Sequence, residues 1–348
     1  MNKIIIPCGY MGSGSSAVTD LISEFDGYDA PNGSYEYVFL HCPDGVFDLE
    51  DKLLLGNNTL RSDEALHSFE KRMYELYSKK FWWVANYKKN IGKDFWHITQ
   101  EYINSLILLK QDDFWYMQER LNTRRFIQMG IRMLVRKLTG NKIRLKRALE
   151  YETMYLSIPT PEEFYSASRT YLDKIFDCLG INEHHLILDQ LLLPHNSHRA
   201  CHYFGDNMEC FIVQKDPRDL FIINKYIWAK TETSMVPYPQ DADSFCDYYQ
   251  RIRNLERDTD NPHIHRLYFE ELIYQYEETK HNIMTILGLT EQQHIRRSEK
   301  FNPQKSIHNT QLFRNPAYKT EIQIIEHKLF DYLFDFPYIH QPDEKNSF

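Results

Sequence analysis

The chain opens with a short apolar run, a glycine-rich turn and then a helical pattern. Ile4, Ile5 and Ile6 are β-branched and are followed by Pro7 and Gly9, which is typical of a buried parallel strand. In residues 15–25 the apolar positions 17, 18, 21, 22 and 25 recur at the spacing of one helix face. The first 25 residues therefore predict a strand, a turn and a helix.

Similar alternation returns further along the chain. We expect further strands at 35–40, 185–189, 209–214 and 265–269. We expect helices at 217–229, 243–257, 274–287 and 319–333, with Pro217 at the start of the first and Gly288 after the third. Strands that alternate with helices form a parallel sheet covered on both faces. The predicted fold class is α/β, a P-loop-type parallel sheet flanked by helices.

The pattern changes between about residues 60 and 175, where long helical segments rich in Trp, Tyr, Lys and Arg replace the strands. We interpret residues 61–175 as a large helical insertion into an α/β domain formed by 1–60 and 176–348. A separate inserted domain is the alternative.

Composition narrows the class of protein. The 348 residues are 42% hydrophobic and 26% charged, which is typical of a globular chain. A net charge of −8 argues against a dedicated nucleic-acid binder. Six cysteines with no CxxC pair are typical of reduced thiols. With only a short apolar run near the N-terminus and no stretch approaching the ~18 apolar residues of a membrane span, we expect a cytoplasmic protein.

The turn after the first strand carries the strongest motif. Residues 9–16 fit GxxxxG followed by two hydroxyl residues, the spacing of a phosphate-binding loop. Such glycines let the backbone N–H groups point inward as an anion nest, and the helix dipole adds favourable potential. Ser15 stands where the lysine of an ordinary ATPase or kinase loop would be. The alternative is a glycine-rich turn without a ligand.

A second candidate anchor follows the strand expected at 209–214. Lys215 and Arg218 lie at a strand-to-helix junction, where open α/β sheets bind ligands. Two cations there would form another anionic pocket. The alternative is that Asp216 or Asp219 caps the helix and that the basic residues are solvated.

Together these segments resemble the sulfotransferases that use 3′-phosphoadenosine 5′-phosphosulfate, and most closely the branch that sulfates glycans. Residues 11–16 (MGSGSS) occupy the place of the family loop PKSGTT, and 215–219 (KDPRD) resemble its RDPRD segment. The remaining similar stretches, in the family's order, are 35–39 (YEYVF), 268–272 (YFEEL), 286–289 (ILGL) and 301–309 (FNPQKSIHN).

The resemblance implies a set of nucleotide-binding residues. These are Gly12, Ser13, Gly14, Ser15, Ser16, Lys215, Arg218, Asn224, Lys305 and Ser306. Two positions depart from the family: Gly12 replaces its basic residue, and Ile223 replaces its serine, with Asn224 alongside. If the chain is active, another cation must replace the one missing at Gly12, and Lys305 and Arg199 are candidates.

Transfer to a hydroxyl also needs a base. Glu36 is the first candidate because it matches the family's glutamate, and a surface carboxylate is the alternative. His195 is the second and His41 a weaker third, since histidine titrates near neutrality. His195, His198 and His202 would share a helix face, which suggests zinc, but without a supporting cysteine pair or HExxH motif we expect no metal.

The insertion contains candidate surfaces for binding an acceptor or a membrane. Residues 124–147 carry nine basic residues and no acid, with apolar residues between them at helical spacing. Such a helix is typical of peripheral contact with the inner membrane face or of an anionic partner; a solvated face is the alternative. Aromatic clusters at 81–83, 95–96 and 114–116 would stack on sugars or fill a core.

The resemblance implies a sulfotransferase acting on a glycan, and we expect a cell-surface polysaccharide or glycolipid precursor as the acceptor. The alternative enzyme is a P-loop kinase or other phosphotransferase, which Ser15 disfavours, although Asp189 is available to hold Mg²⁺. The alternative from another class is a non-catalytic nucleotide-binding protein, which Gly12 and Ile223 favour.

Overall fold

A computed structural model describes residues 2–111, 123–143, 153–228, 238–257 and 260–342. Five parallel strands form the central sheet, in the order β2-β5-β1-β6-β7. Their bounds are β1 Ile4–Gly9, β2 Tyr28–Asp29, β5 His185–Ile187, β6 Met208–Gln214 and β7 Ile264–Tyr268. The expected α/β class with a parallel sheet is confirmed.

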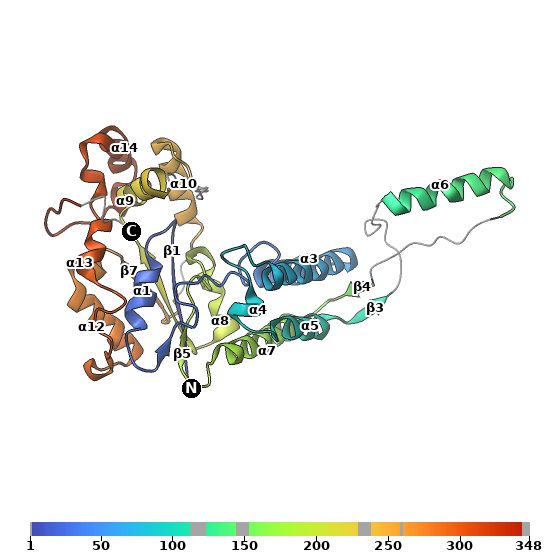
Figure 1. The fold of residues 1–348 in the computed structure, drawn as a ribbon, viewed down its shortest axis with the longest axis horizontal. Coiled ribbons are helices and arrows are strands. Elements are labelled where there is room, and N and C mark those ends of the chain that lie inside the picture. Colours follow the sequence, from blue (N-terminus) through green and yellow to red (C-terminus); the bar gives the residue numbers. More distant parts are fainter. Residues whose placement is uncertain (1, 112–122, 144–152, 229–237, 258–259, 343–348) are drawn as a thin grey trace.

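Helices cover both faces of this sheet (Figure 1). Those of the sheet region are α1 Ser15–Ile22, α2 Val46–Leu54, α8 Ala200–Phe204, α9 Pro217–Ile222, α10 Ala242–Asn254, α11 Glu271–Tyr274, α12 Tyr276–Leu287, α13 Pro303–Ser306 and α14 Lys319–Lys328. Those of the insertion are α3 Thr59–Ser78, α4 Tyr87–Asn90, α5 Phe95–Leu106, α6 Thr123–Leu138 and α7 Pro161–Leu179.

The alternation of side chains along the strands divides the core in two. Ile4, Ile6 and Cys8 of β1 belong to a large buried cluster that also holds residues of α3, α5, α7, α9, α10 and α14. Ile5 faces the other way, into a smaller cluster with residues of α1, α11 and α12. Because the larger cluster joins the sheet to helices of 61–175, the sheet and these helices share one continuous core.

The strand expected at 35–40 is wrong. Residues 35–38 have no regular structure and 39–40 form a turn, while the edge strand is the two-residue β2. The segment is nevertheless buried at Tyr37, Val38 and Phe39. Its backbone is held from outside any ladder: the N–H of Tyr37 donates to the carbonyl of Asp189 at 3.0 Å, and that of Val38 to the Tyr87 hydroxyl at 3.1 Å. The apolar pattern of residues 35–40 therefore reports their burial, but these residues do not form a strand.

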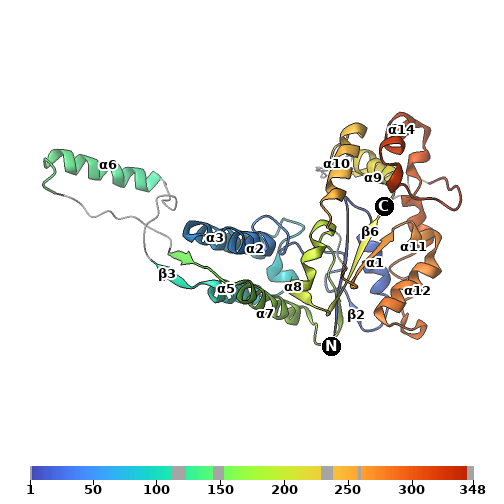
Figure 2. The same ribbon diagram turned by 180° about the vertical axis from the view of Figure 1, so that it is seen from behind.

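The insertion contains a short ribbon that we did not expect. β3 (Leu109–Gln111) pairs antiparallel with β4 (Met154–Leu156), which brings the two ends of the segment carrying α6 together. The base of this ribbon is anchored: Ser157 Oγ donates to the carbonyl of Leu106 at 2.6 Å, and the N–H of Tyr155 donates to Asp63 at 2.7 Å. Figure 2 shows α6 on the far side of this ribbon from the sheet.

Within the described ranges, no helix combines the length and the apolar character that crossing a membrane requires.

Candidate functional site

The loop after β1 lies at the point where the chain reverses its direction across the sheet. From β1 the chain leads to β2 and β5 on one side, whereas β6 and β7 lie on the other. β1 and β6 run side by side to Gly9 and Val213, so the loop and Lys215 emerge at the same edge. In open α/β sheets this reversal creates a crevice at the carboxyl ends of the strands.

The loop is held by one hydroxyl inside it. Ser13 is 1% exposed; its Oγ accepts the N–H of Tyr10 at 3.1 Å and donates to the carbonyl of Val213 at 2.6 Å. Ser13 therefore ties the loop to β6. Within the described part of the chain, no group accepts a hydrogen bond from the N–H of Gly12, Ser13 or Gly14, which leaves those donors for a ligand at the start of α1.

Two aromatic rings lie against the glycines of the loop. Gly12 has φ 85° and Gly14 φ 97°. A Cβ at Gly12 would lie 2.0 Å from Cη2 of Trp228, and one at Gly14 would lie 2.6 Å from Cδ2 of Phe269. Gly12 is therefore required by both conformation and space, which explains why no basic side chain stands there. Trp228 was not singled out by the sequence, because its contact with Gly12 spans more than 200 residues.

Asn224 reaches the loop from the helical segment that follows α9. Its Nδ2 donates to the carbonyls of Met11 at 3.1 Å and Leu220 at 2.8 Å. Its Oδ1 is buried without a hydrogen-bond partner. Asn224, which the resemblance assigns to the nucleotide, holds the backbone of the loop in this structure.

The β5 side of the loop brings polar groups together. Asp189 lies two residues after β5 and accepts a hydrogen bond from Thr19 of α1 at 3.3 Å; it also interacts with Ser15. Gln190 Nε2 donates to Ser15 Oγ at 3.0 Å. Asp189 Oδ1 and Gln190 Oε1 are buried without a partner, which is unusual for buried oxygens and favours a ligand site.

Two residues with strained backbone conformations lie beside the loop after β1. Met11 has φ 51° and Gln190 has φ 57°, both in the left-handed region although neither is glycine. One follows β1 and the other follows β5, the neighbouring strand. Strained positions cluster at functional sites, where the surrounding fold holds them. The sequence signal for Gln190 is weak, but an acid directly after an apolar strand, as at Asp189, was visible.

The charge of Glu36 acts on Asp189 and helps to raise its pKa. Burial raises the pKa of Glu36 to about 7. Burial, together with the charge of Glu36, raises the pKa of Asp189 to about 7 against the hydrogen bonds from Ser15 and Thr19. Two carboxyls with pKa values near neutrality suit acid–base work.

The histidines considered as bases differ from Glu36. Burial lowers the pKa of His195 and lowers that of His41 to about 4, and His41 Nε2 lies 2.8 Å from the carbonyl of Gln190. Both rings are therefore neutral at pH 7. His202 stacks on Tyr165 with centroids 4.5 Å apart. In the ranges that the structure covers, no three His, Cys, Asp or Glu side chains gather as metal ligands do.

The second anchor is a buried, acid-rich cluster. Lys215 is 2% exposed, and its ammonium lies 4.0 Å from the centroid of Phe269, the ring that packs on Gly14. Burial lowers the pKa of Lys215, whereas the charges of Glu270, Asp219 and Asp216 raise it. Burial in turn raises the pKa of Glu270 and Asp219. Lys215 therefore lies among buried carboxyls as well as beside the loop.

The other predicted cations are engaged elsewhere or exposed. Arg218 donates to Asp216 at 2.9 and 2.7 Å and to Glu326 at 3.0 Å, over the ring of Phe313. Arg199 donates to Glu50 and Asp51 of α2 at 2.8 and 2.9 Å.

Lys305 is exposed on α13 and Ser306 is half-buried beside it. Over the described ranges, neither side chain forms a hydrogen bond or ion pair with the loop, and Ser16 is likewise without a side-chain hydrogen bond there.

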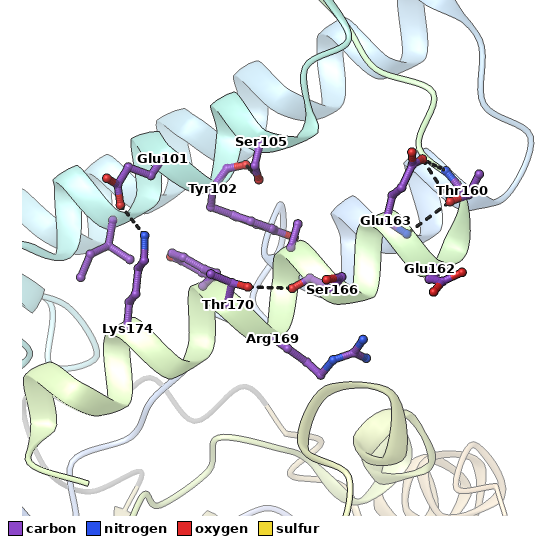
Figure 3. Close-up of a pocket in the computed structure, with 13 residues that line it drawn as sticks. Glu101, Tyr102, Ser105, Thr160, Glu162, Glu163, Ser166, Arg169, Thr170 and Lys174 are labelled. Carbon is purple, nitrogen blue, oxygen red and sulfur yellow. Dashed lines mark hydrogen bonds and ion pairs between the residues drawn. The ribbon is translucent and has the colours of Figure 1, made fainter. Parts of the chain in front are cut away.

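A cavity of about 680 Å³ lies between α5 and α7, away from the loop. Glu101 and Lys174 face each other across it at 2.8 Å, and Arg169 points from α7 (Figure 3). None of the residues expected at the nucleotide site lines this cavity.

The aromatic clusters of the insertion differ in exposure. Phe95 is buried, whereas Phe81 and Trp83 are 98% and 69% exposed. Residues 114–116 lie outside the described residues.

Comparison of this chain with protein-family models, with curated proteins and with solved structures finds no match.

Proposed function

We propose that this chain transfers a sulfonyl group from 3′-phosphoadenosine 5′-phosphosulfate to a hydroxyl of a glycan. The observation that carries the proposal is the loop after β1, where N–H groups at the start of α1 are left for a ligand and Asp189, which follows β5, contacts the first turns of α1. The sulfotransferase chemistry itself rests on the resemblance of the segments.

Each part has a role in the transfer. The N–H groups of Gly12, Ser13 and Gly14 bind the 5′-phosphosulfate and stabilise the charge that grows on the leaving phosphate. Lys215 supplies the cation for the 3′-phosphate. Glu36, with its pKa raised to about 7, takes the proton of the acceptor hydroxyl as oxygen bonds to sulfur and the sulfur–oxygen bond to phosphate breaks.

One observation favours a second candidate, a metal-assisted phosphotransferase. Asp189 follows β5, the neighbour of β1, and contacts Ser15 and Thr19 at the first turns of α1. P-loop phosphotransferases hold Mg²⁺ with an aspartate and a loop hydroxyl in this region. Ser15 in place of the loop lysine weighs against it.

The test is a thermal-shift titration with 3′-phosphoadenosine 5′-phosphate, ADP and ATP·Mg²⁺. A ligand at 100 times its Kd stabilises the fold by about 2.7 kcal/mol. We expect a shift with the bisphosphate that is lost in Lys215→Ala and kept in Lys71→Ala, an exposed lysine on α3. A shift with ATP·Mg²⁺ that is lost in Asp189→Asn would replace this proposal with the phosphotransferase, and no shift with any ligand would favour a non-catalytic protein.

Catalysis is tested with radiolabelled phosphosulfate and a panel of glycans. Removing a base costs about 10² to 10⁴ in rate, so Glu36→Gln should lose that factor while the shift with the bisphosphate is kept. Transfer should continue in EDTA. A variant with full activity would exclude Glu36 as the base.

A further inference from the structure

The helix α6 exposes an apolar face that the rest of the described chain leaves uncovered. Ile127, Ile131, Leu134 and Leu138 recur at the spacing of one helix face and are 60%, 51%, 57% and 77% exposed. We call these four residues the α6 stripe. Phe126 and Met133 flank it and are 59% and 70% exposed. A contiguous exposed patch of this kind marks an interaction surface.

The charge of this segment is opposite to that of the whole chain. From Thr123 to Ile143 there are six basic residues and no acid, whereas the chain carries a net charge of −8. Arg132 and Arg136 are four residues apart and share the helix side opposite the α6 stripe. Lys142 follows the helix and is exposed. The segment is therefore an amphipathic helix with a basic polar face.

We propose that α6 binds flat on an anionic lipid surface, with the α6 stripe among the acyl chains and Arg132 and Arg136 at the level of the headgroups. This is the geometry of interfacial helices with a basic polar face. The occupant follows from charge complementarity: anionic headgroups pair with the basic residues of the segment, whereas a second copy of α6 has no acid between Thr123 and Ile143 to pair with them. A nucleic acid would leave the apolar stripe uncovered.

The β3–β4 ribbon suits this role. It joins the segment that carries α6 to the body at one narrow base, and that base is fixed by the bonds from Ser157 and Tyr155. Leu108 and Leu109, at the start of the ribbon, are also 76% and 52% exposed. The inference does not depend on the nucleotide site, so its failure would leave the proposed function untouched.

The test is sedimentation of the full-length protein with vesicles of phosphatidylcholine containing about 30% phosphatidylglycerol, with pure phosphatidylcholine for comparison. We expect binding to the anionic vesicles alone, which weakens as NaCl rises from about 0.1 to 0.5 M. Replacing Arg132, Arg136 and Lys142 by Glu should lower the partition coefficient by at least about a hundredfold, since each basic residue near an anionic surface contributes about fivefold.

Matched controls separate the helix from bulk charge and bulk hydrophobicity. The variant Lys71→Glu/Arg251→Glu/Lys319→Glu makes the same charge change at exposed sites elsewhere and should bind as the wild type does. The variant Ile131→Ser/Leu134→Ser/Leu138→Ser should lose binding, and Leu255→Ser/Ile295→Ser/Ile339→Ser should keep it.

Three results would overturn the proposal. The first is wild-type protein that stays in the supernatant with anionic vesicles. The second is equal binding by the α6 variants and their controls. The third is a dimer, measured by light scattering, that the serine variant of the α6 stripe abolishes, because it would assign the face to a second copy. Nucleotide shifts measured on the same samples report whether the crevice is intact.

Discussion

Two buried acids of the sheet, Glu209 at its amino end and Asp189 at its carboxyl end, differ in their hydrogen bonding. At the amino end, Glu209 of β6 accepts hydrogen bonds from Lys3 at 2.6 Å, His265 at 2.8 Å and His263 at 3.2 Å. At the carboxyl end, oxygens of Asp189, Gln190 and Asn224 are buried without partners. Glu209 is bonded to three partners, whereas Asp189 keeps one oxygen, Oδ1, without a hydrogen-bond partner.

The difference also appears in the pKa values. The hydrogen bonds from His265, Lys3 and His263 lower the pKa of Glu209 to about 2 against the opposing effect of burial, whereas burial raises the pKa of Asp189 to about 7. A satisfied acid stabilises the fold, while an unsatisfied one lowers stability and is retained where a ligand completes it. Hydrogen bonding therefore separates Glu209 from Asp189, although both are buried carboxyls of the same sheet.

The largest expected effect comes from breaking the satisfied end. Glu209→Ala leaves Lys3, His263 and His265 without their carboxylate. We expect it to lower the free energy of unfolding by about 2 to 3 kcal/mol, a small value for a broken buried ion pair because the three partners are partly exposed. Chemical denaturation measures it, with Glu278→Ala, an exposed carboxylate of α12, as the control. Equal losses in both would mean that this end contributes no special stability.

The same cluster has an acid signature. The pKa of Glu209 is lowered from 4.5 to about 2, so its contribution is present above about pH 4.5 and is lost as pH falls from 4.5 toward 2. A titration of unfolding free energy should lose this acid-dependent part in Glu209→Gln.

A smaller loss is expected from the loop at the other end. Gly12→Ala must adopt φ 85° and displace Trp228, which should cost about 2 kcal/mol. Gly33→Ala is the matched control, since Gly33 has φ 63° and open space around it, so only the conformational cost of about 1 kcal/mol remains. Adding Trp228→Ala should recover the difference, and a double-mutant cycle with no coupling would exclude the contact.

A gain of stability is expected at the unsatisfied acid. The unfolded carboxyl of Asp189 ionises near pH 3.8 but the folded one near 7, so stability falls as pH rises from about 4 to 7. Asp189→Asn should therefore raise the free energy of unfolding at pH 8 by about 1 to 2 kcal/mol. Asp26→Asn, at an exposed position, is the control, and the gain is measured relative to it. Destabilisation would place Asp189 among the structural acids.

The smallest change is expected at Glu36. Its pKa is raised from 4.5 to about 7 by burial, so the sign is the same as for Asp189. Glu36 is less buried than Asp189, so Glu36→Gln should raise stability at pH 8 by about 1 kcal/mol. Thermal unfolding at pH 4 and pH 8 measures the change, which should shrink as pH falls toward 4.5 and be nearly absent at pH 4.

The fold could be predicted wherever local pattern and burial agree. The run from Ile4 and the stretch at 209–214 are strands because they lie in the centre of a parallel sheet, with both faces covered. Residues 35–40 have the same apolar character but take their hydrogen bonds from single groups such as the Tyr87 hydroxyl. The pairing of β3 with β4 depends on closing a long loop, which no local pattern reports.

The site could be predicted only where it depends on local sequence, since contacts between distant residues leave no local pattern. A glycine-rich turn between an apolar run and a helical pattern is visible in the sequence, so the position of the loop between β1 and α1 could be predicted. The partners of Arg218 were not, because Glu326 and Phe313 come from about a hundred residues away. The ring of Trp228 on Gly12 is likewise a tertiary contact that spans most of the chain.

The β3–β4 ribbon makes one part of the chain separable. Gln111 and Met154 are directly opposite each other, so the main chain leaves and returns at neighbouring points. A two-residue Asn-Gly turn joining these strands would close the ribbon as an ordinary hairpin. Such a deletion between Gln111 and Met154 is therefore expected to leave the sheet and the loop after β1 in place.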